Sequence, residues 1–363
     1  MTRVLHYGMS PNLGGIETYL LNLTKHADSS RFEFDFLYSD QGQEPVFAED
    51  LKPNGHKFYG VTPRRTSPRR NRADLEALFE TQKFDVLHFH ANTASYVEPI
   101  RAALRHGVRV IYHSHNAGAS RSRITRLLHR WNQLTLPWAD ITRVAVSGEA
   151  GRWMFGRQSF QVIHNGIDVD AFAFSPAGRE QIRSELGLGP DALVIGSVAA
   201  FLPAKNHEFL LAVFSEVVRR QENAHLLLVG SGPREERARQ LVQQLELEDR
   251  VLFLGRRSDV PTLLSGMDRL LLPSLHEGFP LVAIEAQASG LPCLISEAVT
   301  PEVLVSPFAT QLPLNQPPVA WAEALLAEPQ IDRAEGTKMV SAAGLSTTSA
   351  SKRVESLYVP QRS

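Results

Sequence analysis

The sequence predicts an α/β protein made of two doubly wound parallel sheets. Short apolar runs of strand length alternate with segments of helical periodicity through both halves of the chain. Such alternation is typical of parallel sheets covered by helices on both faces. The 363 residues, 43% of them hydrophobic, suffice for two cores, and the pattern weakens around residues 169–178. We therefore expect an N-terminal domain over 1–172, a C-terminal domain over 173–345, and a last helix in 346–363 that packs back on the N-terminal domain.

The composition excludes several classes of protein. A formal net charge of -1 gives the chain no overall attraction to nucleic acid. The N-terminus has no apolar signal core and no apolar run reaches 18 residues, so we expect a soluble, cytoplasmic protein. The single cysteine, Cys293, lies in an apolar run and is expected to be a buried small hydrophobe.

The first half begins with alternating strands and helices. Gly14 and Gly15 stand at the first strand-to-helix turn, where the missing side chains let a ligand approach the helix start, although a tight turn would also explain them. Helices are expected at 16–26 and 74–82. The expected strands span residues 4–8, 32–38, 58–61, 84–90, 108–112 and 143–147, and residues 162–168 are expected to form a strand followed by a turn.

Two basic segments interrupt this pattern. Five arginines lie in the Pro-broken segment 63–72, which we expect to be a surface loop, because no aromatic residues interleave as in a nucleic-acid-binding arm. The segment 121–138 predicts a basic amphipathic helix. Its arginine face is either solvated or docks peripherally on an anionic membrane surface. The residues of this pattern are Arg121, Arg123, Arg126 and Arg130 with Ile124, Leu127, Leu128 and Trp131.

Histidines gather in two of the expected strands. His88 and His90 lie in one, and His113 and His115 lie at the end of the next. Residues just past the carboxyl end of a parallel strand face the crevice where open α/β sheets bind ligands. We therefore expect His115 to contact a ligand and the others to be structural. A metal site is conceivable, but no carboxylate completes a familiar ligand set, so we predict no metal.

The second half repeats the alternation. Its expected strands span residues 193–198, 224–229, 251–254 and 270–272. Lys205 stands at the first strand-to-helix junction, where a lysine can act as a point charge on phosphate.

The chain is organised around the strand, loop and helix of residues 270–292. Pro280 can open the helix as its first residue and Gly290 can close it, leaving free N–H groups at its start as an anion site. Glu277 precedes the helix, and Glu285 lies on its apolar stripe, where a carboxylate is costly without a partner. This unit offers a phosphate-binding site and two carboxylates that could accept hydrogen bonds from sugar hydroxyls. A core unit with solvated glutamates is the alternative.

Ordered motifs over nearly the whole chain carry a resemblance to a known family. The most specific is the pair Glu277 and Glu285, eight positions apart. The motifs lie at residues 14–18, 113–116, 165–168, 205–208, 229–233, 253–256, 277–285 and 344–358. The chain resembles the retaining glycosyltransferases of the GT-B fold, with two Rossmann-like domains facing a cleft. Within that family it is most similar to bacterial enzymes of capsule and exopolysaccharide assembly.

The resemblance implies transfer of a sugar with retention from a UDP-sugar, favoured over a GDP-sugar, to a glycan or polyprenyl-linked acceptor. It implies no metal and no other cofactor. The docking interpretation of the basic segment 121–138 would place the protein peripherally at the inner face of the cell membrane. The N-terminal domain would bind the acceptor and the C-terminal domain the nucleotide sugar. His115, Glu277 and Lys205 would be catalytic, and Glu285 would hold the donor ribose. The implied donor-binding residues are Gly14, Gly15, Lys205, Gly255, Arg256, Gly278, Phe279, Leu281, Val282 and Glu285.

Two residues depart from the family pattern. Ala200 stands five positions before Lys205, where most relatives carry an arginine for the diphosphate. Pro280 replaces a common glycine and lacks a backbone donor. The alternative function is therefore a catalytically degenerate relative that binds nucleotide sugar. An epimerase or phosphorylase would need a cofactor lysine or substrate set that the sequence does not display.

Overall fold

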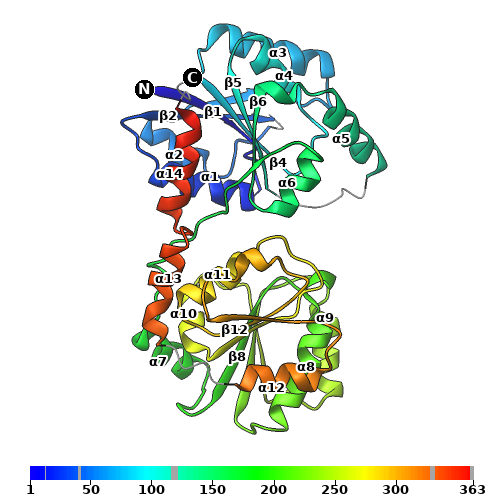
Figure 1. The fold of residues 1–363 in the computed structure, drawn as a ribbon, viewed down its shortest axis with the longest axis vertical. Coiled ribbons are helices and arrows are strands. Elements are labelled where there is room, and N and C mark those ends of the chain that lie inside the picture. The colour runs from blue at the N-terminus through cyan, green and yellow to red at the C-terminus, as the bar shows by residue number, and fades with distance from the viewer. Residues whose placement is uncertain (13, 40–41, 116–121, 328–331, 360–363) are drawn as a thin grey trace. The chain divides into compact units, whose positions relative to one another are not determined.

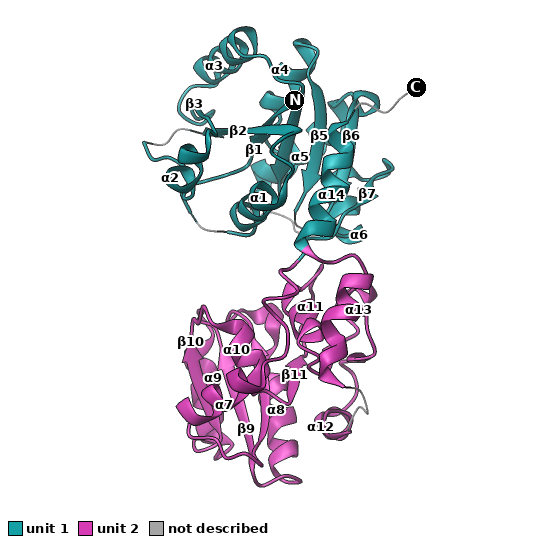
Figure 2. Ribbon diagram, turned by 90° about the vertical axis from the view of Figure 1, so that its left-hand side faces the viewer, with its two compact units in different colours: residues 1–166, 347–363 teal, residues 167–346 magenta. Residues whose placement is uncertain are grey.

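The computed structural model describes residues 1–12, 14–39, 42–115, 122–327 and 332–359 (Figure 1). Contacts divide the chain into unit 1, Met1–Gly166 with Thr347–Ser363, and unit 2, Ile167–Ser346 (Figure 2). The sequence placed the boundary after residue 172, whereas contacts place it after Gly166. Each unit holds one parallel sheet between helices, which confirms the predicted fold class.

Unit 1 contains a sheet with the order β3-β2-β1-β4-β5-β6-β7. Its strands are all parallel. The strand order reverses between β1 and β4, and the carboxyl ends of strands at such a reversal are where open α/β sheets bind ligands. The strands are β1 Thr2–Tyr7, β2 Phe32–Ser39, β3 Phe58–Val61, β4 Val86–Ala91, β5 Arg109–Ser114, β6 Ile141–Ala145 and β7 Gln161–Val162.

Helices cover both faces of this sheet, because successive strand residues point to opposite sides. Leu5 and Leu87 pack in one core with residues of α3, α4 and α6, while Val4 and Val86 pack in the other with residues of α1 and α14. The helices are α1 Gly15–His26, α2 Ala48–Leu51, α3 Pro68–Thr81, α4 Glu98–Arg105, α5 Arg123–Thr135, α6 Gly148–Phe155 and α14 Thr347–Tyr358, with the 3-10 turns η1 Lys52–Asn54 and η2 Trp138–Asp140.

The arginine segment differs from its prediction. Residues 63–72 were expected to form a loop throughout, which is wrong from Pro68 onward, because α3 begins there. The Ser67 side chain caps the helix by accepting a hydrogen bond from the Arg70 N–H, and Pro68 suits a first helical turn. Residues 116–121, which include the first residue of the expected basic helix, lie outside the described part of the chain.

Unit 2 contains a second parallel sheet, with the order β10-β9-β8-β11-β12-β13. Its order reverses between β8 and β11, so the loops after these two strands mark the expected ligand position. The strands are β8 Leu193–Val198, β9 Ala224–Val229, β10 Val251–Gly255, β11 Arg269–Leu272, β12 Cys293–Ser296 and β13 Ala309–Leu312.

The helices of unit 2 also form two layers. One core packs residues of α7, α10, α11 and α13, and it holds the buried Cys293, as predicted. The other packs α8, α9 and α12. The helices are α7 Pro176–Glu185, α8 His207–Val218, α9 Glu235–Gln244, α10 Val260–Gly266, α11 Leu281–Ala288, α12 Pro318–Leu326 and α13 Gly336–Ala342, with the 3-10 turns η3 Pro203–Lys205, η4 Pro301–Val303 and η5 Arg333–Glu335. Within the described ranges, no helix of either unit combines the length and the apolarity needed to cross a bilayer.

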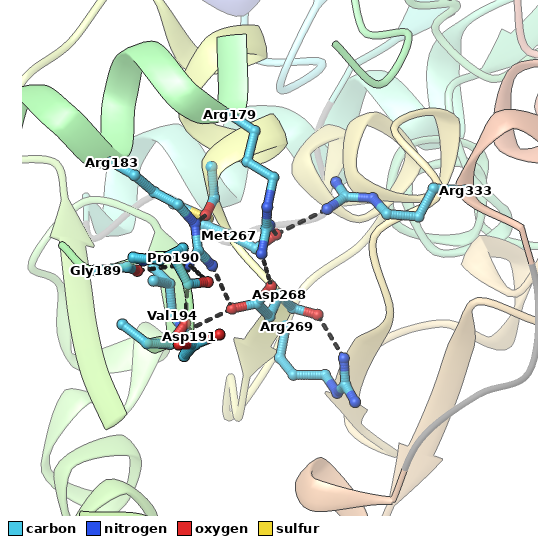
Figure 3. A network of polar contacts seen from close by, with 12 residues as sticks. Arg179, Arg183, Gly189, Pro190, Asp191, Val194, Met267, Asp268, Arg269 and Arg333 are labelled. Carbon is cyan, nitrogen blue, oxygen red and sulfur yellow. Dashed lines mark hydrogen bonds and ion pairs between the residues drawn. The ribbon is translucent and has the colours of Figure 1, made fainter. Parts of the chain in front are cut away.

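A polar network ties the amino-terminal edge of this sheet to its helices (Figure 3). Asp268 accepts hydrogen bonds from Arg179 and Arg183 of α7, both at 2.6 Å, and from the Val194 N–H at 2.8 Å. Arg333 donates to the carbonyl of Met267 at 2.8 Å. Because the Arg183 side chain is only 6% exposed, its charge depends on Asp268 for compensation.

Replacing Asp268 with Asn should therefore destabilise unit 2 by about 3 kcal/mol, since a buried guanidinium loses its carboxylate. Urea unfolding of the variant against the parent protein measures this loss. Asp259→Asn is the matched control, because its ion pair with Arg257 lies near the surface and should contribute less than about 1 kcal/mol. Equal losses in the two variants would contradict the role of Asp268.

Candidate functional site

The candidate site of unit 2 begins where two loops join at the carboxyl ends of β8 and β11. The Leu275 N–H donates to the Ala204 carbonyl at 2.7 Å, and the Asn206 side-chain amide donates to the Pro273 carbonyl at 3.1 Å. Asn206 adopts a left-handed conformation with φ of 55°, which Asn tolerates better than most residues. The two loops are thus held together by hydrogen bonds within the protein itself.

A salt bridge joins the same two loops. The Lys205 ammonium is 2.6 Å from one carboxylate oxygen of Glu277, and the Ser274 hydroxyl donates to the other oxygen. The two side chains are mostly buried, with 22% and 11% exposed. Both oxygens of Glu277 are engaged, so the carboxylate has a defined orientation. The ammonium has three N–H groups, so it keeps donors for an anion.

Helix α11 starts next to this salt bridge. Pro280 is its N-cap, with φ -69° and ψ 112°, so the expectation that Pro280 is the first helical residue is wrong by one position. Gly278 and Phe279 precede the cap, and Leu281 and Val282 form the first turn. The N–H groups of a first turn have no intrahelical partner, and the helix dipole adds positive potential there.

Glu285 differs from Glu277 in its surroundings. It lies within α11, partly buried, and its carboxylate forms no hydrogen bond or ion pair with any residue in the described ranges. Burial raises the pKa of Glu285 to about 7. A half-buried carboxylate of this kind is stabilised by a ligand that donates hydrogen bonds to it.

The loops after β9 and β10 complete this edge of the sheet. Gly230 has φ of +142°, and a Cβ there would lie 2.1 Å from the Ala199 carbonyl oxygen, so only glycine fits. Gly255 accepts a hydrogen bond from the Gly230 N–H at 2.7 Å, and the exposed Arg256 follows it. Ala200 is exposed in the loop after β8 and brings no cation to the site.

Unit 1 holds the remaining predicted residues. Gly14 is the N-cap of α1 and Gly15 its first residue, and a Cβ on Gly15 would meet no atom within 4 Å. The buried Glu17 accepts hydrogen bonds from the Ser10 N–H at 2.9 Å and the Ser10 hydroxyl at 2.8 Å, which shapes the loop before the helix. The start of α1 is therefore open to a ligand.

Five buried or half-buried histidines form a cluster on one face of the unit 1 sheet. Nδ1 of His90 lies 2.9 Å from Nε2 of His115, and Nε2 of His90 lies 3.1 Å from Nδ1 of His6. Nε2 of His88 lies 3.2 Å from Nδ1 of His113, and Nδ1 of His88 lies 2.7 Å from the hydroxyl of Tyr358. The sequence prediction did not include His6, because only the pairing of β1 with β4 brings it opposite His88.

The cluster is uncharged at neutral pH. Burial lowers the pKa of His6 and of His115 to about 3, and it lowers the pKa of His88, His90 and His113 as well. Nδ1 of His115 is buried without a hydrogen-bond partner in the described ranges. Ring nitrogens of His90, His113 and His115 lie within 4.8 Å of one another, a spacing that a metal ion could bridge. The absence of a metal stays a prediction.

The structure thus gathers the predicted residues at two sheet edges. Lys205, Glu277, Glu285 and the start of α11 share the edge at β8 and β11, and His115 and the start of α1 belong to unit 1. Gly255 and Arg256 lie at the end of β10, three strands from β11 in the sheet order. Sequence reasoning missed Ser274 and Asn206, which position Glu277 and the loops, because a lone Ser or Asn in a loop carries no specific signal.

Comparison with known proteins identifies matching families for both halves. Residues 178–327 match the family of glycosyl transferases group 1, and residues 13–171 match glycosyltransferase family 4. The chain is 34% identical to the glycosyltransferase EpsF of Bacillus subtilis (strain 168), over 89% of the chain and 86% of that protein.

One further relative and one solved structure extend the comparison. The chain is 24% identical to the UDP-Gal:alpha-D-GlcNAc-diphosphoundecaprenol alpha-1,3-galactosyltransferase of Escherichia coli, over 81% of the chain and 79% of that enzyme. The crystal structure of Anabaena HepE in complex with UDP superposes with a TM-score of 0.76 at 20% identity, covering 98% of this chain and 99% of HepE. The likeness to HepE shows that this chain has the same fold.

The histidine cluster should make unit 1 sensitive to acid. Because burial lowers each folded-state pKa, the unfolded chain binds more protons, so stability present above the ordinary histidine pKa is lost as the pH falls below it. We expect a loss of about 1 kcal/mol per histidine between about pH 7 and pH 5.5.

Urea unfolding at these pH values measures the effect. His88→Gln should flatten the pH dependence, because it removes one buried histidine whose pKa burial lowers. The same pH slope in the His88 variant and in the parent protein would refute this explanation.

Proposed function

Since the chain belongs to glycosyltransferase family 4, whose members are retaining enzymes that use nucleotide sugars, we propose that its donor is a UDP-sugar and its acceptor a glycan or lipid-linked glycan of surface polysaccharide. EpsF supports the family, and the E. coli relative is named for a UDP-Gal donor and a diphosphoundecaprenol-linked acceptor. A GDP-sugar is the second candidate donor.

The observation that carries this proposal is the unpartnered carboxylate of Glu285 beside the start of α11. Two vicinal ribose hydroxyls would supply the hydrogen-bond donors that this carboxylate lacks. The N–H groups of Leu281 and Val282 and the Lys205 ammonium would hold the diphosphate, because a helix start and a lysine both favour phosphate oxygens. Gly255 and Arg256, at the end of β10, would border the nucleoside.

The transferred sugar would meet Glu277 together with the backbone of Gly278 and Phe279. In unit 1, His115 would face the reacting side of the sugar, and Gly14 and Gly15 would let the diphosphate approach the start of α1.

The proposed mechanism follows from where charge develops during transfer of the sugar. The bond between the anomeric carbon and the diphosphate breaks, and the leaving diphosphate gains negative charge. The start of α11 and Lys205 stabilise that charge without a metal. The acceptor hydroxyl then attacks the oxocarbenium-like carbon from the face that the diphosphate leaves, which retains the configuration. Its proton passes to a departing phosphate oxygen or to a nearby base.

Ala200 motivates the alternative function. A charge-assisted hydrogen bond to phosphate is worth about 1.5–3 kcal/mol, so the missing arginine weakens diphosphate stabilisation by roughly 10- to 100-fold. A degenerate relative would bind the donor without turning it over. Incubation with UDP- and GDP-sugars, with and without a lipid-linked glycan acceptor, separates the two by release of nucleoside diphosphate. Donor binding without release across the panel would establish the degenerate relative.

Substituting Glu285 with Gln should separate donor binding from stability. The ribose hydroxyls lose a charged acceptor, so donor affinity should fall at least about 10-fold. The folded-state pKa of Glu285 is raised, so ionisation costs folding energy as the pH rises from about 4.5 to about 7, and the variant should gain on the order of 1–3 kcal/mol at about pH 8.

Thermal unfolding with and without UDP measures both effects, because a bound ligand stabilises by mass action. Glu248→Gln, an exposed carboxylate just before β10, is the matched control. Undiminished UDP stabilisation in the Glu285 variant would refute its assignment.

We further propose that α5 docks this protein on an anionic membrane at the cytoplasmic face. Its amphipathicity is inverted. The inward side chains are polar, with His129 accepting from the Ala94 N–H at 2.9 Å and the Asn132 amide donating to the Ala94 carbonyl at 2.6 Å. The outward stripe is apolar, with Ile124, Leu127, Trp131 and Leu134 at 61–84% exposed. The helix carries three arginines and no acidic residue.

Flotation with vesicles containing phosphatidylglycerol tests this surface. Replacing Arg123, Arg126 and Arg130 with Ala should weaken binding by about 1 kcal/mol per arginine at low salt. Replacing Trp131 and Leu127 with Ser should weaken it at any salt. Substitution of Arg69, Arg70 and Arg72 on α3 removes the same charge elsewhere and should have little effect. Unchanged flotation of the α5 variants would exclude docking through this helix.

A further inference from the structure

The arginine segment that precedes α3 contributes to a cavity that the donor site does not use. Its volume is about 850 Å³, and it belongs wholly to unit 1. Arg64 and Arg65 line it from the segment itself. The other side chains that matter here are Tyr7, Ser39, Ser95 and Tyr96.

The cavity lies at a ligand-binding position of the fold. Tyr7 ends β1 and Ser39 ends β2, while Ser95 and Tyr96 follow β4. These are carboxyl ends of neighbouring strands, at the point where the strand order of this sheet reverses between β1 and β4. Open α/β sheets bind ligands at such points.

Its two guanidinium groups lack negative partners. Arg64 donates to the Ser95 carbonyl at 2.8 Å, and its guanidinium carbon lies 5.4 Å from the centre of the Tyr96 ring. Neither Arg64 nor Arg65 forms an ion pair with a carboxylate among the residues that the structure describes. The nearby Asp74 accepts instead from the Thr62 N–H at 2.9 Å. Two uncompensated cations at one cavity favour an anion.

Aromatic rings provide the rest of the surface. Tyr7 stacks on Phe89 with ring centres 4.7 Å apart and lies 5.8 Å from Tyr96. The Tyr96 hydroxyl donates to the Asn71 side chain at 3.0 Å, which fixes that ring. The Tyr7 hydroxyl has no hydrogen-bond partner within the described ranges and remains available to a ligand. Tyrosines combine an apolar face with a polar tip, which suits a sugar or a lipid stem.

We infer that this cavity receives the acceptor through a diphosphate ester, held by Arg64 and Arg65, with Tyr7 and Tyr96 against the attached sugar or lipid. Guanidinium groups match phosphate geometry with paired N–H donors, whereas the cavity offers no carboxylate to repel the anion. The inference rests on the proposed function, because it names the acceptor class of that reaction. It predicts that acceptors without the diphosphate bind poorly.

Calorimetric titration of the full chain tests it with farnesyl diphosphate, farnesol and inorganic pyrophosphate. The parent protein should bind farnesyl diphosphate best. Arg64→Gln with Arg65→Gln should weaken that binding about 10- to 100-fold. Arg65→Gln alone should weaken it as well, and it removes no hydrogen bond of the described residues. Arg69→Gln is the matched control, since it changes the same charge on exposed α3.

Two sets of variants distinguish a failure of this inference from a failure of the proposed function. Glu285→Gln should weaken stabilisation by UDP and leave farnesyl diphosphate binding intact, and the arginine variants should do the reverse. Unchanged farnesyl diphosphate binding in the arginine variants would overturn the inference. So would farnesol binding as tightly as the diphosphate, or pyrophosphate binding as tightly as the ester. Failure of every donor to release nucleotide would overturn the proposed function and leave the anion site standing.

Discussion

The salt bridge between Lys205 and Glu277 holds together the edge of unit 2 on which the candidate donor site depends. Its two residues come from loops after β8 and β11, strands that are neighbours in space but separated by two strand–helix repeats in sequence. The hydrogen bond from Asn206 to Pro273 and the one from Leu275 to Ala204 fix the same two loops. A site built on such internal contacts needs little ordering when a ligand arrives.

Glu277 and Glu285 belong to one loop and helix but meet different environments. Lys205 compensates the charge of Glu277, and the Ser274 hydroxyl donates a hydrogen bond to its carboxylate. Glu277 is therefore stabilised by residues of the protein alone. Glu285 has no such partner in the described ranges. Its pKa is raised because partial burial disfavours the ionised carboxylate. A residue that lowers stability in the free protein is typical of a position kept for binding. The contrast favours Glu285, rather than Glu277, as the proposed contact to the donor ribose.

Unit 1 departs from ordinary packing on two of its surfaces. Helix α5 turns polar side chains inward and an apolar stripe outward, the reverse of a helix on a water-exposed surface. The cavity at Arg64 and Arg65 gathers positive charge without a carboxylate within the described ranges. The two proposed partners, an anionic membrane for α5 and a diphosphate ester for the cavity, would account for these departures.

The sequence by itself determined the fold class, because strand and helix periods and the Gly and Pro positions are local properties. It also identified the Glu277 and Glu285 element, whose charged residues stand out in an apolar run. Only the tertiary structure decided which distant residues meet. His6 joins His88 because β1 and β4 are neighbours, and Asp268 meets Arg183 across the sheet edge. The orientation of α5, the capped start of α3 and the cavity at Arg64 likewise depend on packing between segments far apart in the chain, which no local pattern records.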